Sequence, residues 1–381
     1  MNKYNTLVGM DVHARSTTCA ALIVETGERR TKRFGECPAP ADIAAWFATL
    51  PQPLYCAYES GCTAFEMCRG LRGLGYDCDV IAVSTLPRSK KDRQQKCDRL
   101  DARAILREVA NPLSGYTTVA VPAADVEAAR DLARLHGDAV AALKRAKQQL
   151  SAFLLRHGHV WDERTPSGNR KKAWGRDFTA WLRSIRLEQP AAQAALEAYR
   201  DQVERCGEYE GRTRALVEAE AEAPRWKPYV DALRRLKGVD TCTAFLAACE
   251  FGDFGRFSSG GAVSAWLGTV PSNDSSGEKV AHGPITKAGN SHLRRALVEG
   301  NAGISRRGAG AKRPAEGQSV SPEVERMARR ANARLLERFR HLTEDLGKPA
   351  NKARIAVVNE QVRWIWAIGR AVQAELEGAA V

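Results

Sequence analysis

The sequence predicts a mixed α/β domain at the N-terminus, followed by two mainly helical regions. Up to about residue 115, short apolar segments bounded by turn residues alternate with helical segments. From 124 to about 225, Ala, Leu, Glu, Lys and Arg dominate, which is typical of long helices. From 229 to 376, helical segments are separated by stretches rich in Gly, Ser and Asn.

The N-terminal elements follow one another in the order β-β-β-α-β-α-β-α. The expected strands are 5–11, 17–26, 29–36, 54–60 and 78–83, and the expected helices are 40–50, 64–75 and 97–110. A hairpin meander that passes into helix-linked strands is typical of an RNase H-like α/β fold.

The middle region carries apolar residues at heptad spacing. They are Leu143, Ala146, Leu150 and Phe153 in one segment, and Leu196, Tyr199, Val203 and Cys206 in another. This spacing predicts two long helices with a coiled-coil seam, joined through a basic loop at 162–177. Such a seam indicates either packing within the chain or dimerisation.

The C-terminal region begins with a predicted helix-turn-helix at 229–257 and a further helix at 259–268. A polar stretch at 269–304 follows, and residues 305–321 read as a flexible basic insertion. An arginine-rich helix and an amphipathic helix at 352–372 complete the region.

Charge points to a polyanionic partner. The 381 residues carry a formal net charge of +13, with 58 Lys and Arg against 45 Asp and Glu. Nucleic acid is the first candidate for that partner and a membrane surface the second, while a merely basic enzyme is the alternative.

Several classes of protein are disfavoured by composition. No run of about 18 apolar residues is present, so we expect no membrane span. The N-terminus has no signal-peptide pattern, and the ten scattered cysteines form neither a C-x-x-C pair nor a zinc pattern. We therefore expect reduced thiols and a cytoplasmic location.

Two carboxylates lie three residues apart in "KCDRLDARAI", at Asp98 and Asp101. On a helix these positions share a face. Together with Asp11 and Glu59, each at the end of a predicted strand, they could bind Mg²⁺, which prefers oxygen ligands. The alternative is that Asp98 caps the helix and Asp101 pairs with a neighbouring arginine. The order of the strand ends favours a metal site suited to two-metal phosphodiester chemistry.

A second polar motif, "NDSSGEKVAHGPITKAGNSHLRRAL", combines glycines, serines and cations. Lys279, Lys287, Arg294 and Arg295 suit phosphate binding. Serine needs activation to act as a nucleophile, and loops of this kind are more often polar surface loops with turn hydrogen bonds. The residues alone therefore leave the role of the serines open.

Four segments together resemble the DEDD transposases of bacterial insertion sequences, of the insertion-sequence-110 type that are described as bridge-RNA-guided recombinases. The segments are "VGMDVHARST", "CAYESGCTAFEMCRGLRGLGYDCDVIAVS", "KCDRLDARAILREVA" and "AWLGTVPSNDSSGEKVAHGPITKAGNSHLRRAL". The resemblance implies a RuvC-like domain at 1–115, a coiled-coil region at 124–225 and a transposase domain at 229–376.

The resemblance also implies a mechanism. The four acids of the family fall on Asp11, Glu59, Asp98 and Asp101, and its catalytic serine falls on Ser276, with Ser275 as the alternative if the loop is shifted by one. Mg²⁺ is the implied cofactor. The implied partners are donor and target DNA, a structured guide RNA, and further copies of the chain in a homodimer or a dimer of dimers. The implied location is the bacterial cytoplasm, in association with the nucleoid.

One residue departs from the family pattern, because Asp240 stands where relatives carry a second glycine in a hairpin, so phosphate binding by that turn is in doubt. Two rival functions are a RuvC-like junction resolvase or structure-specific nuclease without guide RNA, and a catalytically dead nucleic-acid-binding protein. The four intact acids argue against the second.

Overall fold

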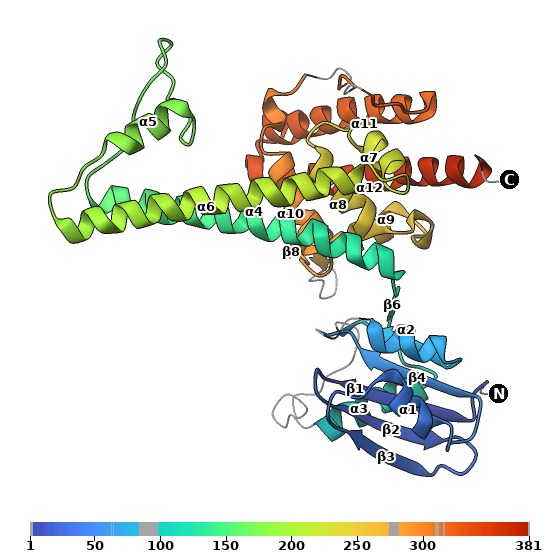
Figure 1. Cartoon of the computed structure of the whole chain (residues 1–381). Helices are drawn as coiled ribbons and strands as arrows, with labels where there is room; N and C mark the ends of the chain where they lie inside the picture. Colours follow the sequence, from blue (N-terminus) through green and yellow to red (C-terminus); the bar gives the residue numbers. More distant parts are fainter. Residues whose placement is uncertain are drawn as a thin grey trace. The chain divides into compact units, whose positions relative to one another are not determined.

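The computed structural model describes residues 3–61, 63, 65–83, 98–273, 282–308, 312–314 and 317–379. The chain divides into two compact units, Met1–Ala123 and Ala124–Val381 (Figure 1). Each unit has its own hydrophobic core.

The first unit is built on a six-stranded sheet with the strand order β3-β2-β1-β4-β5-β6. Its elements are β1 (Thr6–Val12), β2 (Thr17–Ile23), β3 (Arg29–Phe34), α1 (Pro40–Phe47), β4 (Leu54–Glu59), α2 (Glu66–Gly73), β5 (Asp77–Ile81), α3 (Asp98–Ala110) and β6 (Thr118–Val119). The predicted mixed α/β architecture is therefore confirmed for this unit. Only β6, which has two residues, was not predicted.

Pairing within the sheet follows from the connections along the chain. Short turns join β1 to β2 and β2 to β3, and these pairs are antiparallel. A helix connects β3 to β4 and another connects β4 to β5, so β1, β4 and β5 run parallel. The sheet thus brings the carboxyl ends of β1 and β4 to one edge.

Side-chain alternation assigns the two faces of the sheet. Val8 and Met10 of β1 pack into the core that includes residues of α1 and α2. Leu7, on the opposite face, packs with Ala102 and Leu106 of α3. The sheet is therefore covered by α1 and α2 on one face and by α3 on the other.

Gly9 allows α3 to lie directly on β1. A Cβ atom at this position would overlap the carbonyl oxygen of Ala102 and the backbone nitrogen of Leu106. Only glycine leaves room for this approach of two backbones, so Gly9 fixes the height of α3 above the sheet.

The second unit is mainly helical and carries one small hairpin. Its elements are α4 (Ala124–Arg156), α5 (Arg176–Ser184), α6 (Pro190–Ala221), α7 (Lys227–Leu233), α8 (Thr241–Phe251), η2 (Phe254–Arg256), α9 (Gly260–Leu267), β7 (Pro271–Asn273), β8 (His282–Ile285), α10 (Ser291–Gly300), η3 (Ile304–Arg306), α11 (Pro322–Arg340), the π-helical turn η4 (His341–Asp345) and α12 (Ala350–Ala379). The prediction of a mostly helical C-terminal part is confirmed.

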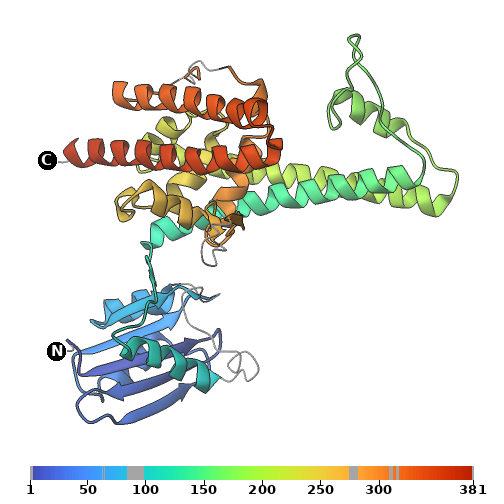
Figure 2. The same ribbon diagram turned by 180° about the vertical axis from the view of Figure 1, so that it is seen from behind.

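The two long helices, α4 and α6, lie side by side over their length (Figures 1 and 2). Leu150 of α4 and Leu196 of α6 are fully buried within the single chain. The apolar seam is therefore occupied by packing inside the chain, and these two residues are not available as a dimer surface.

The connection between the long helices contains a helix that the sequence analysis missed, α5, which begins at the last two residues of the predicted basic loop. Phe178 and Leu182 of α5 pack with Leu150 and Leu196. Trp161 and Trp181 stack tilted, with ring centroids 5.3 Å apart. Aromatic packing thus orders part of a segment that its Gly and basic residues made look irregular.

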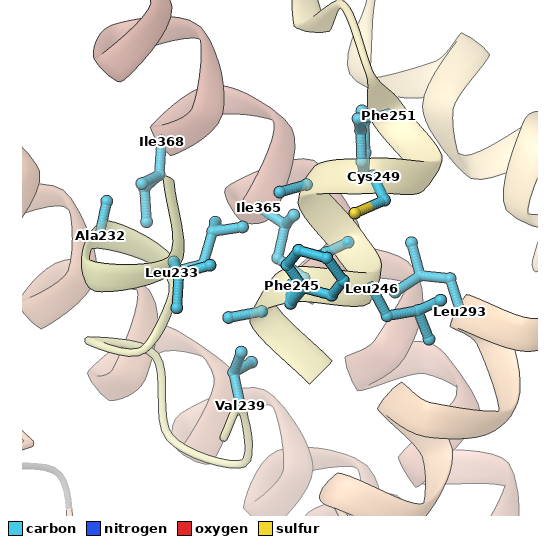
Figure 3. Close-up of a cluster of buried hydrophobic side chains, with 14 of the residues drawn as sticks. Ala232, Leu233, Val239, Phe245, Leu246, Cys249, Phe251, Leu293, Ile365 and Ile368 are labelled. Carbon is cyan, nitrogen blue, oxygen red and sulfur yellow. The ribbon is translucent and has the colours of Figure 1, made fainter. Parts of the chain in front are cut away.

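The main core of the second unit joins α7, α8, α10 and α12. Phe245 and Phe251 of α8 lie among Leu233, Leu293 and Ile365 (Figure 3). Because α8 is buried on nearly every side, it serves as the fixed element against which the hairpin and α10 are placed.

Two expectations from composition can be compared with the structure. No helix in the described part of the chain is long and apolar enough to cross a membrane. The eight cysteines among the described residues are free thiols, and most are buried.

Candidate functional site

Asp11 and Glu59 come together through the register of β1 and β4. The last paired residues of these parallel strands are Met10 and Tyr58, so Asp11 and Glu59 are the next pair in register. By alternation, Glu59 is on the same face as Ala57, which packs with Ile105 of α3. Two carboxylates therefore lie at one edge of the sheet, on the face that α3 covers.

Asp11 is held in a mostly buried position. Only 14% of its side chain is exposed, and its Oδ2 lies 3.0 Å from Nε2 of His13. The sequence analysis did not single out His13, although the two-residue spacing of "DVH" at a strand end was a usable signal. The imidazole can orient this carboxylate or share a proton with it.

The first turn of α3 lies at the level of these two acids. Val109 and Tyr55 belong to the cluster in which Ile105 packs with Ala57. Four helix residues advance about 6 Å and two strand residues about 6.6 Å, so the next step pairs the level of Asp101 with that of Glu59. Ala102 lies beside Gly9, so the same step of four helix residues and two strand residues brings residue 98 to the level of Asp11.

The other two predicted acids, Asp98 and Asp101, lie in the first turn of α3. Asp101 is half-buried and forms no ion pair with any side chain that the structure describes, which excludes Arg103 as its partner. The side chain of Arg99 lies outside the described residues, so pairing of Asp101 with Arg99 stays a prediction. Asp98 is the first residue of α3, and its side chain lies outside the part of the chain that the structure describes. Within the described residues, no three His, Cys, Asp or Glu side chains already form a metal-binding cluster.

The serine motif is carried by the hairpin of β7 and β8. Ser275, Ser276 and Lys279 lie between the two strands and outside the described residues. The base of the hairpin is well defined, because the backbone N–H of Thr286 donates to Val270 and that of Lys287 donates to Gly268, at 2.9 and 3.1 Å.

Two glycines let the ends of this hairpin segment cross closely. Gly268 and Gly289 both have positive φ, at 72° and 100°. A Cβ at Gly268 would overlap the carbonyl oxygen of Ala288, and a Cβ at Gly289 would overlap that of Trp266. These two positions therefore require glycine for both conformation and space.

A buried carboxylate ties the exit of the hairpin to the core. Glu250 of α8 accepts hydrogen bonds from Nε and Nη2 of Arg134, at 2.7 and 3.0 Å. It also accepts one from Nδ2 of Asn290, at 2.8 Å, while Oδ1 of Asn290 caps α10 by accepting from Leu293. Only 3% of the Glu250 side chain is exposed. The network therefore anchors the start of α10 on α8 and α4.

The sequence analysis missed Glu250, although a lone acid in the apolar helix "AFLAACEF" was a signal. Asn359 was missed as well. Its Nδ2 donates to the backbone oxygen and to Oγ1 of Thr269, each at 3.1 Å, and so ties the entry of the hairpin to α12.

The three described cations predicted to bind nucleic acid differ in their environment. Lys287 is exposed at the hairpin base. Arg295 is exposed and donates to the backbone oxygen of Gly137 at 3.2 Å. Arg294 donates to the backbone oxygen of Leu267 at 2.7 Å, and burial lowers its pKa. Arg294 therefore closes the end of α9, which makes it a structural residue first.

The turn around Asp240 is not shaped like a phosphate-binding hairpin. The Asp240 side chain caps α8 by accepting from the backbone N–H of Thr243 at 2.8 Å. The guanidinium of Arg307 donates to Lys237 and Asn301 and fills the space beside Gly238. Because the Asp240 carboxylate occupies the helix cap at this turn, the turn is poorly suited to bind phosphate.

The same contacts correct the view of residues 305–321 as a flexible linker. Arg307 is partly buried, and Lys312 donates from Nζ to the backbone oxygen of Val239 at 2.7 Å. Burial lowers the pKa of Lys312 to about 8. The described part of this segment is therefore anchored to the α7–α8 turn.

Comparison with known proteins gives the class of protein. A family model described as the Transposase IS116/IS110/IS902 family matches residues 230–315, which include α8 and the hairpin. A Sinorhizobium fredii protein named "Putative transposase y4qE" is 36% identical over 376 residues, or 95% of this chain and 88% of the relative. The Leptospira borgpetersenii "Transposase for insertion sequence element IS1533" is 27% identical over 89% of this chain and 97% of the relative.

The chain is therefore a transposase, an enzyme that cuts and rejoins DNA. It belongs to the IS116/IS110/IS902 family and serves insertion sequences of that type, which confirms the resemblance found in the sequence at the level of the family.

Proposed function

We propose that the enzyme cuts DNA by attack of the Ser276 hydroxyl, assisted by a Mg²⁺ site formed by Asp11, Glu59, Asp98 and Asp101. The observation that carries this proposal is the register of β1 and β4. It sets Asp11 and Glu59 side by side at one edge, and the packing of α3 on β4 supports a position of Asp98 and Asp101 near the same level.

The donor set suits Mg²⁺, because all four side chains offer hard carboxylate oxygens. Asp11 and Glu59 would form the floor of the site on the sheet, and the first turn of α3 would contribute the remaining ligands. When bound, the ion would stabilise negative charge on the scissile phosphate.

In the proposed chemistry, the energy of the broken phosphodiester bond is kept in a new bond between serine and phosphorus. The oxygen of Ser276 forms a bond to phosphorus, and the bond from phosphorus to one deoxyribose oxygen breaks. The hydroxyl gives up its proton to solvent, and the released deoxyribose oxygen takes up a proton from solvent, so no net proton is consumed. The resulting phosphoserine ester can be reversed by another DNA end, which exchanges strands without another energy source.

Other residues would hold the DNA in place. Lys287 and Arg295 are exposed beside the hairpin, and Lys279 belongs to the same segment, so they are suited to contact phosphates that flank the cut. Arg294 would act indirectly, by supporting the hairpin base from its contact with Leu267.

The finer features of the fold are part of the proposal. The strand order and the two covered faces support an RNase H-like, RuvC-like domain at 1–115. The paired helices α4 and α6 support a coiled-coil region at 124–225, and the family match at 230–315 supports a transposase domain at 229–376.

We also propose a structured guide RNA, donor and target DNA as partners, and assembly as a homodimer or a dimer of dimers. The net charge of +13 supports binding of polyanions. A discrete RNA encoded by the element, found by sequencing the RNA that copurifies with the protein, would support the guide. Random cellular RNA would contradict it.

The serine mechanism is tested by trapping the covalent product. Wild type should give a protein–DNA band that resists denaturation and is removed by protease. Ser276→Ala should bind DNA as wild type does but give no band.

Ser275→Ala is the matched control, since it changes the adjacent hydroxyl. It should keep the band, and loss of the band in this variant alone would assign the nucleophile to Ser275. A wild type that recombines DNA without ever giving the band would favour a nuclease that uses water.

A further inference from the structure

A cavity of about 400 Å³ opens in the first unit between α3 and the edge of the sheet. Its floor is formed by Ala20 and Leu22 of β2 and by Leu106 of α3. Its lining includes four arginines, which are Arg29 and Arg30 from β3 and Arg103 and Arg107 from α3. We call this cavity with its four arginines the arginine groove.

The strand β3 makes the groove accessible. It is the edge strand of the sheet, and five of its six residues are exposed, from Arg29 to Arg33. Arg29 pairs in register with Leu22, which faces α3, so Arg29 lies on the same face as that helix. Lys32 is at the opposite parity, and its Nζ lies over the ring of Phe34, 4.9 Å from the centroid.

Three of the four cations that line the groove are not neutralised. Among the side chains that the structure describes, Arg29, Arg103 and Arg107 have no ion-pair partner, and Asp101 is the one acid that lines the cavity. The fourth cation, Arg30, is at the opposite parity of β3 and pairs with Glu28.

Arg103 and Arg107 also repel each other, because they are four residues apart on one helix. Such a like-charge pair destabilises a helix. An anion in the groove would remove this repulsion, and guanidinium groups match phosphate oxygens in geometry.

The length and position of the groove fit a DNA strand. The groove follows α3 from Asp101 to Ala110, which is about 13.5 Å at 1.5 Å per residue. This length corresponds to about four base-pair steps along a duplex axis, at about 3.4 Å per step. Asp101 marks the end of the groove that is nearest to the proposed metal site.

We propose that the arginine groove binds the phosphodiester backbone of the DNA strand that leads to the four acids. DNA, rather than RNA, is the occupant because the groove begins at Asp101, one of the acids proposed to act on DNA. The choice of DNA over RNA rests on the proposed function. The contact of the arginines with the phosphates does not depend on cleavage.

The test is DNA binding by the full-length protein without Mg²⁺, measured by fluorescence anisotropy with a labelled 30-base-pair duplex at several salt concentrations. The double variant Arg103→Gln/Arg107→Gln removes two phosphate contacts. The slope of log affinity against log salt should therefore fall by about 1.8, and affinity near 0.1 M salt should drop at least about fivefold.

The matched control is Lys3→Gln/Lys32→Gln, which removes the same charge from exposed positions outside the groove. It should leave the slope nearly unchanged. An equal loss in both double variants would overturn the proposal, because only net charge would then matter. Should the α3 variant fail to fold, Arg29→Gln on β3 serves instead, with an expected slope change of about 0.9.

A parallel titration with RNA that copurifies with the protein separates the two nucleic acids. A larger loss for this RNA than for duplex DNA would overturn the assignment to DNA. The covalent adduct is scored separately with wild type. A missing adduct contradicts the serine mechanism, whereas an unchanged salt slope contradicts the groove.

Discussion

The two units of this transposase hold their candidate sites by different means. In the first unit, backbone pairing of β1 with β4 places Asp11 and Glu59, and Gly9 lets α3 pack directly on the sheet. In the second unit, side chains far apart in sequence hold the base of a small hairpin, chiefly Glu250 with Arg134 and Asn290.

This difference decides what a sequence can predict about each site. Backbone register requires only that the strands be recognised and their order inferred. A side-chain network requires knowledge of which distant helices meet. It also makes the two sites sensitive to different substitutions, which the following variants measure.

The largest effect is expected for Gly9→Ala in the first unit. The new methyl group overlaps two backbone atoms of α3, so the helix must move, at a cost of about 3 kcal/mol or more. Hydrogen exchange should increase in peptides from β1 and α3 and stay unchanged in the second unit.

Gly35→Ala is the control for this variant, since nothing lies within 4 Å of a Cβ at Gly35. It should change stability by less than about 0.5 kcal/mol. Equal protection of α3 in Gly9→Ala and wild type would show that the close approach does not hold the acid site.

Leu150→Ala probes the helical pair of the second unit. Leu150 is fully buried, so its truncation should cost about 2–3 kcal/mol and loosen α5 and α6. The control Leu155→Ala alters a leucine on the same helix that is 65% exposed, and should have little effect. Sedimentation should give the same oligomer for Leu150→Ala as for wild type, and conversion to monomers would restore the seam as a dimer surface.

Asn290→Asp tests the side-chain network that holds the hairpin. Aspartate still caps α10, but it replaces a donor to Glu250 by a second carboxylate. Around this pair stand the cations Arg134 and Arg130, with His292 nearby. Repulsion raises the pKa of one of the two carboxyls, so the folded state binds a proton more tightly than the unfolded state.

The penalty of Asn290→Asp should therefore be largest above neutral pH, about 1–2 kcal/mol, and should shrink as pH falls toward 5. Hydrogen exchange in peptides from 282–290 measures it. Asn169→Asp, at an exposed turn, adds the same charge and should show no such pH dependence. A pH-independent penalty in Asn290→Asp would argue that the contact with Glu250 is dispensable.

A change that depends on alkaline pH is expected for Lys312→Met. Burial lowers the pKa of Lys312 to about 8, so between pH 8 and about 10 the unfolded lysine keeps a proton that the folded one has lost. Wild-type stability therefore gains with pH in this window, and the variant lacks that gain. At pH 7 the variant should have a higher free energy of unfolding in urea than wild type, and this difference should shrink by pH 9.5. A constant difference would contradict the burial of this charge.

Much of the first unit could be predicted because its strands have clear apolar patterns and short connections. The parallel order that joins Asp11 to Glu59 followed from helices between strands. By contrast, β6 has only two residues, and α5 is ordered by aromatic contacts such as that of Trp161 with Trp181. Neither of these leaves a periodic signal in the sequence.

The hairpin of the second unit could be predicted only as a polar motif. The glycines of the motif, Gly289 among them, indicated close backbone approach, but Gly268 was not singled out, and the partners of both glycines depend on tertiary packing. The role of Glu250 depends on the meeting of α4, α8 and α10. Residues 305–321 were predicted to be flexible for the same reason, because Arg307 and Lys312 find their partners at the α7–α8 turn.

The central claim is that the ion bound by Asp11, Glu59, Asp98 and Asp101 touches the phosphate that Ser276 attacks. It is tested most directly by measuring the rate of covalent adduct formation on DNA with a single sulfur at a nonbridging position of the scissile phosphate. Magnesium binds sulfur poorly, whereas softer divalent ions accept it. The account predicts a slow reaction for one sulfur stereoisomer in Mg²⁺, restored in Mn²⁺. Equal rates for both stereoisomers and the unmodified DNA in Mg²⁺ would contradict it.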